Sequence, residues 1–216
     1  MSAKRGFGSR PGSGALLVGL TGSFGTGKST AARLFRDRGA QVIDTDRLAH
    51  EVFRRGNRLY PKIRALFPEI QGTVNRAKVA RVVFRNAGKR KRLERLVHPY
   101  VFGRISEELR RRQKGIVVIE VPLLFESGFH RKCARTVVVK ARPSEVVRRL
   151  RFKGFSKGEV EARWRAQWPL GRKTARADFI IENSKGLGRT RAQVRTVWNQ
   201  LNRIERSLLK HAKRKR

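Results

Sequence analysis

The sequence predicts an α/β fold, with helices on both faces of a parallel β-sheet in a doubly wound, three-layer arrangement. Three observations lead to this prediction. An apolar run at residues 15–22 is followed at once by a glycine-rich turn, a helical pattern and a second apolar segment. Such a βαβ unit requires parallel strands. Later apolar runs have the length and composition of strands buried on both faces, and they alternate with helical patterns.

The first βαβ unit can be followed along the chain. The strand ALLVGLTG occupies residues 15–22, and a helix is expected from Lys28 to about Arg38. The apolar side of that helix consists of Ala31, Ala32, Leu34 and Phe35. Gly39 stands where a C-terminal cap belongs. QVID, residues 41–44, predicts the next strand.

From about Leu48 to Gln113 the pattern changes to helical spacing, which predicts a mostly helical insertion. The parallel core resumes with GIVVIEVPLLFE, residues 115–126, and RTVVVKA, residues 135–141. The remaining segments are a helix that starts at Pro143, a basic and partly helical segment 156–177, a strand 178–184 and a long terminal helix.

Composition limits the class of protein. The 216 residues suit one medium-sized domain with an insertion, and 39% hydrophobic residues predict a globular protein. With 53 Lys and Arg against 16 Asp and Glu, the formal charge is +37, so polyanions are expected partners. A phosphate-rich substrate and non-specifically bound nucleic acid both fit this charge. No apolar run approaches the ~20 residues of a membrane helix.

The lone cysteine and the two ends of the chain suggest simple interpretations. Cys133 excludes an intramolecular disulfide and is interpreted as a small buried side chain, which fits a reducing cytoplasm. Residues 1–14 are expected to form a disordered basic tail, with a targeting fragment as the alternative. Residues 206–216 are expected to form a second basic tail, with a nuclear-localisation cluster as the alternative.

The segment GSFGTGKS matches the phosphate-binding pattern G-x-x-x-x-G-K-[ST] at every fixed position. Glycines let backbone N–H groups curl around phosphate oxygens, and the following helix points its positive end at them. Lys28 is predicted to bridge the β- and γ-phosphates, and the Ser29 hydroxyl to complete a magnesium shell. The nucleotide site is expected to consist of Gly22, Ser23, Phe24, Gly25, Thr26, Gly27, Lys28, Ser29 and Thr30.

Three carboxylates stand at or near predicted strand ends, where ligands collect in open α/β sheets. Asp46 is predicted to accept the proton of an attacking hydroxyl or to hold magnesium through water. Asp44 has the same two interpretations, and either aspartate could instead cap the helix that follows. The two would share one side only if the strand ran through both. Glu120 resembles a Walker-B acid, with a loop hydrogen-bond partner as the alternative.

The basic segment after residue 143 suits a lid over a triphosphate, because phosphoryl transfer rewards electrostatic positioning. Its candidate cations are Arg149, Arg151, Lys153, Arg163, Arg165, Arg172 and Lys173. Most cations of so basic a chain must instead form a solvated face. Trp164 and Trp168 are interpreted as helix-packing residues rather than base-stacking ones. Pro99 marks a break or start of a helix, and His98 a partly buried cap or a site residue.

Several segments together resemble the dephospho-coenzyme A kinase family over about Leu17 to Leu201. They are GLTGSFGTGKST, VIDTDRLAHEV, NRAKVARVVF with LVHPYV after it, VPLLFESG and RADFIIENS. The resemblance implies a P-loop kinase domain at 15–205, which consists of a nucleotide-binding core, a helical substrate domain inserted at about 48–113 and a lid at about 151–175. It implies transfer of the γ-phosphoryl group of ATP, with Mg²⁺, to the 3′-hydroxyl of dephospho-coenzyme A.

The resemblance also implies residue roles. Asp46 matches the general base, Arg149 an arginine associated with the transferring phosphoryl group, and Leu123 and His98 the side that receives the substrate. The chain departs from the family pattern at Ser23-Phe24, where a small glycine and an aliphatic residue are usual, and at Glu120, which replaces the common aspartate. It also departs at RFKGF, which is shortened and lacks the usual arginine just before its Gly. Two alternatives remain: another small-molecule P-loop kinase, and an RNA-associated protein with a vestigial P-loop.

Overall fold

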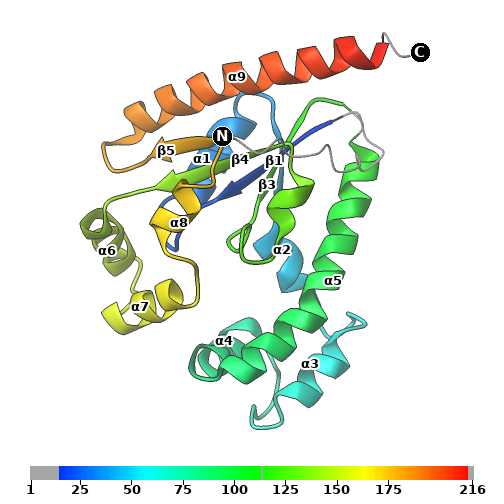
Figure 1. Ribbon diagram of the computed structural model, residues 1–216. Coiled ribbons are helices and arrows are strands. Elements are labelled where there is room, and N and C mark those ends of the chain that lie inside the picture. The colour runs from blue at the N-terminus through cyan, green and yellow to red at the C-terminus, as the bar shows by residue number, and fades with distance from the viewer. Residues whose placement is uncertain (1–14, 113, 214–216) are drawn as a thin grey trace. The chain divides into compact units, whose positions relative to one another are not determined.

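The computed structural model describes residues 15–112 and 114–213, and its strands form one sheet in the order β2-β3-β1-β4-β5 (Figure 1). The strands are β1 (Leu16–Thr21), β2 (Gln41–Asp44), β3 (Ile116–Glu120), β4 (Arg135–Lys140) and β5 (Phe179–Glu182). The predicted leader and the last three residues of the predicted C-terminal tail lie outside the described residues. The α/β class predicted from the sequence is confirmed.

The centre of the sheet is β1, which pairs in parallel with β3 on one side and β4 on the other. Val18 lies opposite Val118 and Arg135, and β4 in turn pairs in parallel with β5. All six residues of β1 and all five of β3 are buried, which explains their continuous apolar character. The carboxyl end of β1 therefore emerges from the middle of the sheet.

One face of the sheet is covered by α1 (Lys28–Arg36) and α9 (Leu187–Lys213) (Figure 1). Their apolar sides share a buried cluster with the strands, in which Phe35, Val194 and Leu201 expose almost no surface. The predicted cap of α1 is present. Gly39 has φ 99°, and the bonds from Gly39 N–H to the Arg36 carbonyl and from Ala40 N–H to the Phe35 carbonyl satisfy the helix end.

The strand predicted to reach Glu126 ends at Glu120. Pro122 has no N–H group to continue a ladder, so the chain leaves the sheet there and turns through η2 (Phe129–Lys132). The carbonyl of Pro122 accepts hydrogen bonds from Thr21 Oγ1 and from Lys173 Nζ of α8 (Leu170–Thr174). The loop after β3 is therefore held from both β1 and α8.

The basic segment after β4 folds into α6 (Pro143–Phe152) and α7 (Lys157–Arg165), with Pro143 at the start of α6 as predicted. Ser156 and Glu159 form a capping box at the start of α7. The two helices enclose a small apolar cluster built on Ala141, Val146, Leu150 and Val160, against which Phe24, Phe155 and Trp164 pack. An aromatic residue of the phosphate-binding loop is thus part of this cluster.

Residues 44–108 form a second compact unit, distinct from the sheet unit that contains the other described residues. Its elements are α2 (Thr45–His50), η1 (Glu51–Phe53), α3 (Tyr60–Leu66), α4 (Arg76–Arg85) and most of α5 (Ala87–Arg111). Its own core is built on Val52, Ile63, Phe67, Ile70, Val74, Val79 and Val83. Tyr100 links its parts, since the phenol donates to Glu51 and accepts from Asn57.

Two local predictions need correction. Helix α5 runs through Pro99, which was expected to break or start a helix. Pro99 lies on an exposed side of α5, where water can satisfy the carbonyl that proline leaves without a donor. At the other end, α9 continues through residues 206–213, which were set apart as a tail. Within the described residues, no helix has both the length and the apolar character needed to cross a membrane.

Cys133 is 8% exposed, and burial raises the pKa of its thiol from 9.0 to about 12. The neutral thiol is thus retained in the folded state, while the unfolded chain ionises from about pH 9. We therefore expect iodoacetamide at pH 8.5 to leave Cys133 of the folded protein unmodified while it labels the urea-unfolded chain completely. Stability should be unaffected by this group below pH 9 and fall between pH 9 and 12. Equal labelling of both states would contradict the assignment.

Candidate active site

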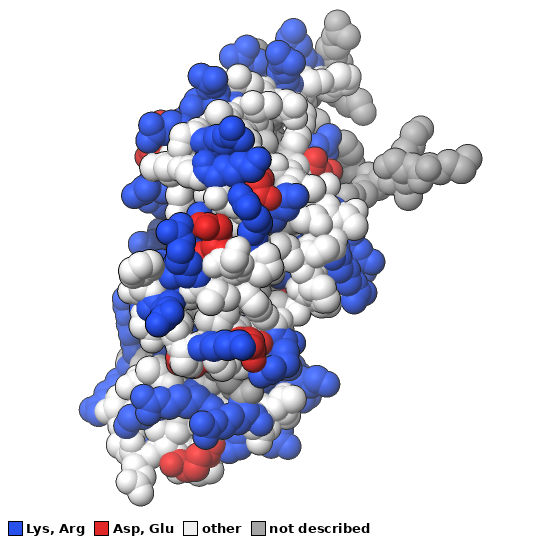
Figure 2. Space-filling model, turned by 90° about the vertical axis from the view of Figure 1, so that its left-hand side faces the viewer, with Lys and Arg blue, Asp and Glu red and all other residues white. Residues whose placement is uncertain are grey.

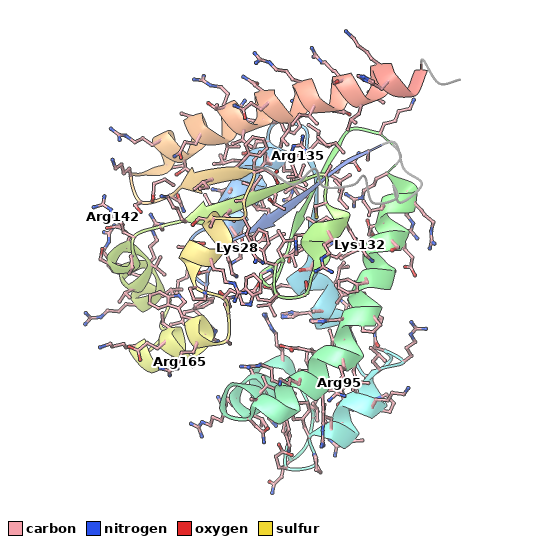
Figure 3. All side chains as sticks on the ribbon, in the orientation of Figure 1. Lys28, Arg95, Lys132, Arg135, Arg142 and Arg165 are labelled. Carbon is pink, nitrogen blue, oxygen red and sulfur yellow. The ribbon has the colours of Figure 1, made fainter. Side chains whose placement is uncertain are left out.

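The phosphate-binding loop spans the gap between the carboxyl end of β1 and the first turn of α1, where Figure 3 labels Lys28. Within the described part of the chain, the backbone N–H groups of Gly25, Gly27 and Ser29 donate to no protein acceptor. Such donors at a helix N-terminus form an anion-binding site. The loop therefore offers N–H groups for the oxygens of a phosphate chain.

Gly27 is required at its position for two reasons. Its φ of 94° lies in the left-handed region, and a Cβ there would collide with Nδ2 of Asn183. That Nδ2 donates to the Thr26 carbonyl at 2.9 Å, and Asn183 Oδ1 accepts from Thr190 Oγ1 at 2.8 Å. Asn183 follows β5 and is 6% exposed. It fastens the phosphate-binding loop to β5 and α9.

The two polar side chains at the start of α1 have different contacts. Ser29 Oγ donates to Glu120 Oε1 at 2.9 Å, which joins α1 to the end of β3. Lys28 is 9% exposed, and its Nζ donates to the Ser23 carbonyl at 3.2 Å, across the mouth of the loop. A hydroxyl and a carboxylate oxygen side by side are hard ligands of the kind that Mg²⁺ prefers.

Phe24 belongs to the phosphate-binding loop, and residues of α7 and its flanks enclose it. Its N–H donates to Gln167 Oε1 at 3.1 Å, and its carbonyl accepts from Trp164 Nε1 at 3.1 Å. Its ring meets Phe155 edge to face, with 5.2 Å between centroids. The guanidinium of Arg163 lies 4.8 Å from the Phe24 centroid. This cluster accounts for the unusual aromatic residue.

Arg149 lies on α6, and its Nη2 donates to the Asn183 carbonyl at 2.7 Å. Glu145 lies one turn earlier, with 3.9 Å between the charged groups. The same helix carries Val146 and Leu150, against which Gly25 packs closely. Arg149 is therefore joined to the phosphate-binding loop through Asn183, and its side chain retains 31% of its exposure.

A buried ion pair fixes the segment between α7 and α8 to the loop that carries Leu123. Lys173 has no exposed surface, and its Nζ lies 2.9 Å from Glu126 Oε1. The same carboxylate accepts from the Trp168 N–H at 2.9 Å. The indole of Trp168 in turn stacks under Arg172, whose Cζ is 3.7 Å from the ring centroid. Of the predicted lid cations, Lys173 is thus a buried structural residue.

Asp44, Asp46 and His98 belong to the second unit. The strand β2 ends at Asp44, so the two aspartates do not share one side of a strand. Asp44 caps α2, because its carboxylate accepts from the N–H groups of Asp46 and Arg47 at 2.9 and 3.2 Å. Asp46 is exposed in the first turn of α2, and His98 lies beside Phe102 with 5.9 Å between ring centroids.

The pKa of His50, the last residue of α2, depends on the charges of these aspartates and of a nearby arginine. Partial burial and the cation of Arg76 lower the pKa of His50, while Asp46 and Asp44 act to raise it. Desolvation is the largest of these effects, so the neutral imidazole is favoured in the folded state.

Three residues of the sheet unit contact the site or its supports, although the sequence singled out none of them. Asn183 was visible only as a polar residue just after the apolar letters FII of β5. Gln167 gave no signal, because its bond to Phe24 joins positions 143 residues apart. Glu126 was visible as an acid after the apolar PLLF. A polar residue just after an apolar strand or run is the sequence pattern that could have indicated Asn183 and Glu126.

Known proteins resemble the chain along most of its length. A family model of dephospho-CoA kinase matches residues 16–188. The chain belongs to the dephospho-CoA kinase family. This family of transferases phosphorylates dephospho-CoA to CoA in the last step of CoA biosynthesis and uses ATP as substrate. The family membership inferred from sequence motifs is therefore confirmed.

Individual relatives agree with the family model. The chain is 40% identical over 190 residues to dephospho-CoA kinase of Symbiobacterium thermophilum, covering 84% of this chain and 80% of that protein. The chain is 34% identical over 192 residues to dephospho-CoA kinase of Aquifex aeolicus, covering 86% of this chain and 97% of that protein. Both relatives of this dephospho-CoA kinase family member are therefore matched over most of their length.

Solved structures show the same fold. The crystal structure of TT1252 from Thermus thermophilus is 37% identical in sequence to this chain and matches it with a TM-score of 0.77. The match covers 87% of this chain and 98% of the TT1252 chain. Dephospho-CoA kinase from Campylobacter jejuni, at 22% identity and a TM-score of 0.58, covers 88% and 98% and supports the fold alone.

Replacing Asn183 with alanine should weaken the sheet unit of this kinase. The substitution leaves the Thr26 carbonyl without a donor and the Thr190 hydroxyl without this acceptor, and each unsatisfied buried group costs about 1–3 kcal/mol. We expect Asn183→Ala to lower the free energy of unfolding by about 2–4 kcal/mol and to weaken ATP binding. Urea titration and calorimetry with ATP measure both effects.

Thr196→Ala provides the matched control, because Thr196 is exposed on α9 and its hydroxyl bonds only to a carbonyl of the same helix. Its effect should stay within about 0.5 kcal/mol. Equal effects of the two substitutions would show that Asn183 does not fasten the loop.

Proposed function

We propose that this chain transfers the γ-phosphoryl group of ATP to the 3′-hydroxyl of dephospho-CoA. The observation that supports the transfer is the phosphate-binding loop. Its N–H groups of Gly25, Gly27 and Ser29, beside Lys28, have no acceptor among residues 15–112 and 114–213. The choice of acceptor rests on the family to which the chain belongs. The nucleotide is held by residues 22–30, as the motif predicts.

In this proposal the loop and Lys28 bind the phosphate chain. The backbone N–H groups surround the β-phosphate, and the positive end of α1 favours its charge. Lys28 exchanges its contact with the Ser23 carbonyl for the β- and γ-phosphate oxygens. These contacts hold the γ-phosphorus in place for in-line attack, which supplies most of the catalysis in phosphoryl transfer.

Ser29 and Glu120 fit a magnesium ion that accompanies ATP. Their oxygens are 2.9 Å apart at the start of α1 and the end of β3, and both are hard ligands. A bound ion would neutralise charge on the β- and γ-phosphates. The Ser29 hydroxyl would ligate the ion, and the Glu120 carboxylate would accept a hydrogen bond from that hydroxyl or from a water molecule on the ion. The family's usual aspartate is one methylene shorter, so Glu120 is the departure that bears on this site.

Asp46 is proposed as the general base. It is exposed at the start of α2, and Asp44 caps that helix, which fixes the backbone from which Asp46 projects. A carboxylate so held accepts the proton of the attacking hydroxyl. His98 and Leu123 are proposed to contact the acceptor, and Leu123 lies in the loop held by Thr21 and Lys173.

Arg149 and the lid segment are proposed to stabilise charge on the transferring group. The guanidinium of Arg149 is held at the carbonyl of Asn183 and by Glu145, and a third of its surface stays available. The residues of about 151–175 contact Phe24 of the loop through Trp164 and Gln167. A cation just before such a lid segment, as Arg149 is, can stabilise the negative charge on the phosphoryl oxygens in the transition state.

The activity is tested by mass spectrometry of the acceptor after the protein is mixed with ATP, Mg²⁺ and dephospho-CoA. We expect the acceptor to gain one phosphoryl group and to become CoA. The Lys28→Ala variant should form no product, because it lacks the charge at the γ-phosphate. An acceptor that stays unmodified while ATP binds would exclude dephospho-CoA and leave another small-molecule acceptor.

The role of Asp46 is tested by separating turnover from nucleotide binding. Asp46→Asn should lower kcat by roughly 100- to 10,000-fold, since an amide accepts no proton, and leave the Kd for ATP unchanged. Asp37→Asn is the matched control, because Asp37 is exposed at the end of α1 and follows the last helical residue. A kcat of Asp46→Asn equal to that of the control would assign proton transfer to another group.

A further inference from the structure

The outer side of α9 carries five exposed cations that no acid neutralises. They are Arg191, Arg195, Arg203, Arg206 and Lys210, here called the α9 stripe. In the part of the chain that the structure describes, none of these side chains has a hydrogen bond or an ion pair. Figure 3 shows side chains with nitrogen tips standing off the side of α9 that faces away from the sheet.

The α9 stripe lies opposite the buried side of the helix. The buried side contacts the core through Val194, Val197 and Leu201, with Ile204 and Leu208 continuing the same line. At 3.6 residues per turn, the five cations fall within the other half of the helix. From Arg191 to Lys210 the stripe extends for about 28 Å at 1.5 Å per residue.

Helices α6 and α7 pair some of their cations with acids of the same helix. In α6, Glu145 pairs with Arg148 at 2.8 Å, and in α7, Glu161 lies 3.8 Å from Arg165 and 4.0 Å from Lys157. Three pairs of the α9 stripe are like charges at i+3 or i+4, namely Arg191 with Arg195, Arg203 with Arg206, and Arg206 with Lys210. Such pairs destabilise a helix by about 0.2–0.5 kcal/mol each. Within the described residues, no acid pairs with the stripe to offset this local cost.

The length of the stripe favours a polymeric anion. A nucleotide or a single phosphate neutralises one or two neighbouring cations, whereas 28 Å of cations on one side match a continuous phosphate backbone. Figure 2 shows Lys and Arg over much of the viewed face with few acids between them, so long-range attraction draws a polyanion to the protein. The stripe adds ordered contacts to that general attraction.

A membrane surface fits the stripe less well. Helices that bind membranes bury an apolar side about 5–10 Å into the lipid. The apolar side of α9 is already occupied by the core of the sheet unit. Single strands are also disfavoured, because their bases stack on aromatic side chains. Trp198, the aromatic residue of α9, packs against the core instead.

The shape of the helix surface favours duplex RNA over duplex DNA. Only the outer half of α9 is accessible, so the helix cannot enter a deep groove. The minor groove of B-DNA is about 6 Å wide, too narrow for a helix about 10–12 Å across, and its major groove is deep. The minor groove of A-form RNA is wide and shallow. A half-embedded helix can lie across it and reach the phosphates that flank it.

We propose that the outer side of α9 is a docking surface for duplex RNA, bound through its phosphate backbone across the minor groove and without sequence preference. The proposal does not depend on the phosphoryl-transfer activity, because the α9 stripe lies on the helix side opposite the sheet that carries the phosphate-binding loop. Kinase turnover should therefore be unaffected by changes in the stripe.

The test uses the full-length protein and a fluorescent 20-base-pair RNA duplex of arbitrary sequence, with binding followed by anisotropy over a range of salt. The stripe variant carries Arg191→Gln, Arg195→Gln, Arg203→Gln, Arg206→Gln and Lys210→Gln. We expect it to weaken RNA binding by at least about 100-fold at 0.1 M salt and to make the slope of log K against log salt shallower by about 3–4. Circular dichroism verifies that α9 stays folded.

A matched variant removes the same charge elsewhere. It carries Arg81→Gln, Arg85→Gln, Lys91→Gln, Arg92→Gln and Arg95→Gln, all exposed positions of α4 and α5. Its RNA affinity should fall by less than about 5-fold, because it loses only long-range attraction. Equal weakening by both variants would show that the charge acts diffusely and would overturn the proposal.

Two further probes separate the other occupants of the surface. A DNA duplex of the same sequence should bind the unmodified protein about 10-fold more weakly than the RNA, as expected if contact requires a wide minor groove. Vesicles with phosphatidylserine should not compete with the RNA. Equal binding of DNA, or displacement of RNA by the vesicles, would contradict the assignment to duplex RNA.

Discussion

The site depends on one constraint: the N–H groups of a loop must remain without protein acceptors, although the loop lies in the middle of a folded sheet unit. Gly25 and Gly27 are partly buried and Ser29 is exposed, and since these donors gain no bond within the loop, its shape depends on other contacts. In this chain it is fastened from several directions. Asn183 holds the Thr26 carbonyl, Gln167 and Trp164 hold the backbone of Phe24, and Ser29 is held by Glu120.

These contacts come from separate parts of the sheet unit. Asn183 follows β5, Glu120 ends β3, and Trp164 lies on α7. Their common reference is β1, which is bonded in parallel on both sides and therefore fixes where the loop begins. The parallel sheet thus gathers residues from distant positions around a single loop, which is how this fold builds ligand sites at strand ends.

The excess of positive charge divides into parts with different physical roles. Lys173 is buried and paired with Glu126, so it supports the fold. Arg163 stacks on Phe24 and Phe155. Cations on α6 and α7 pair with acids of their own helices. Among the described residues, Arg191, Arg195, Arg203, Arg206 and Lys210 of α9 have no such partners and lie along one side of a single helix.

The sequence by itself determined the class of the fold, the phosphate-binding loop and the family, because these rest on local patterns. The apolar run of β1, the spacing of GSFGTGKS and the helix that starts at Lys28 are read within 25 residues. Burial on both faces requires apolar strands, and phosphate binding requires this loop, so the patterns carry the information directly.

Only the tertiary structure decided the ends of several elements and the neighbours of the loop. A strand that ends at Asp44 rather than passing through Asp46, and a helix that runs through Pro99, depend on packing and hydration that local preference does not contain. Gln167 meets Phe24 across 143 residues, and Asn183 meets Thr26 across 157. Such contacts have no local signature, because the folded sheet alone brings their partners together.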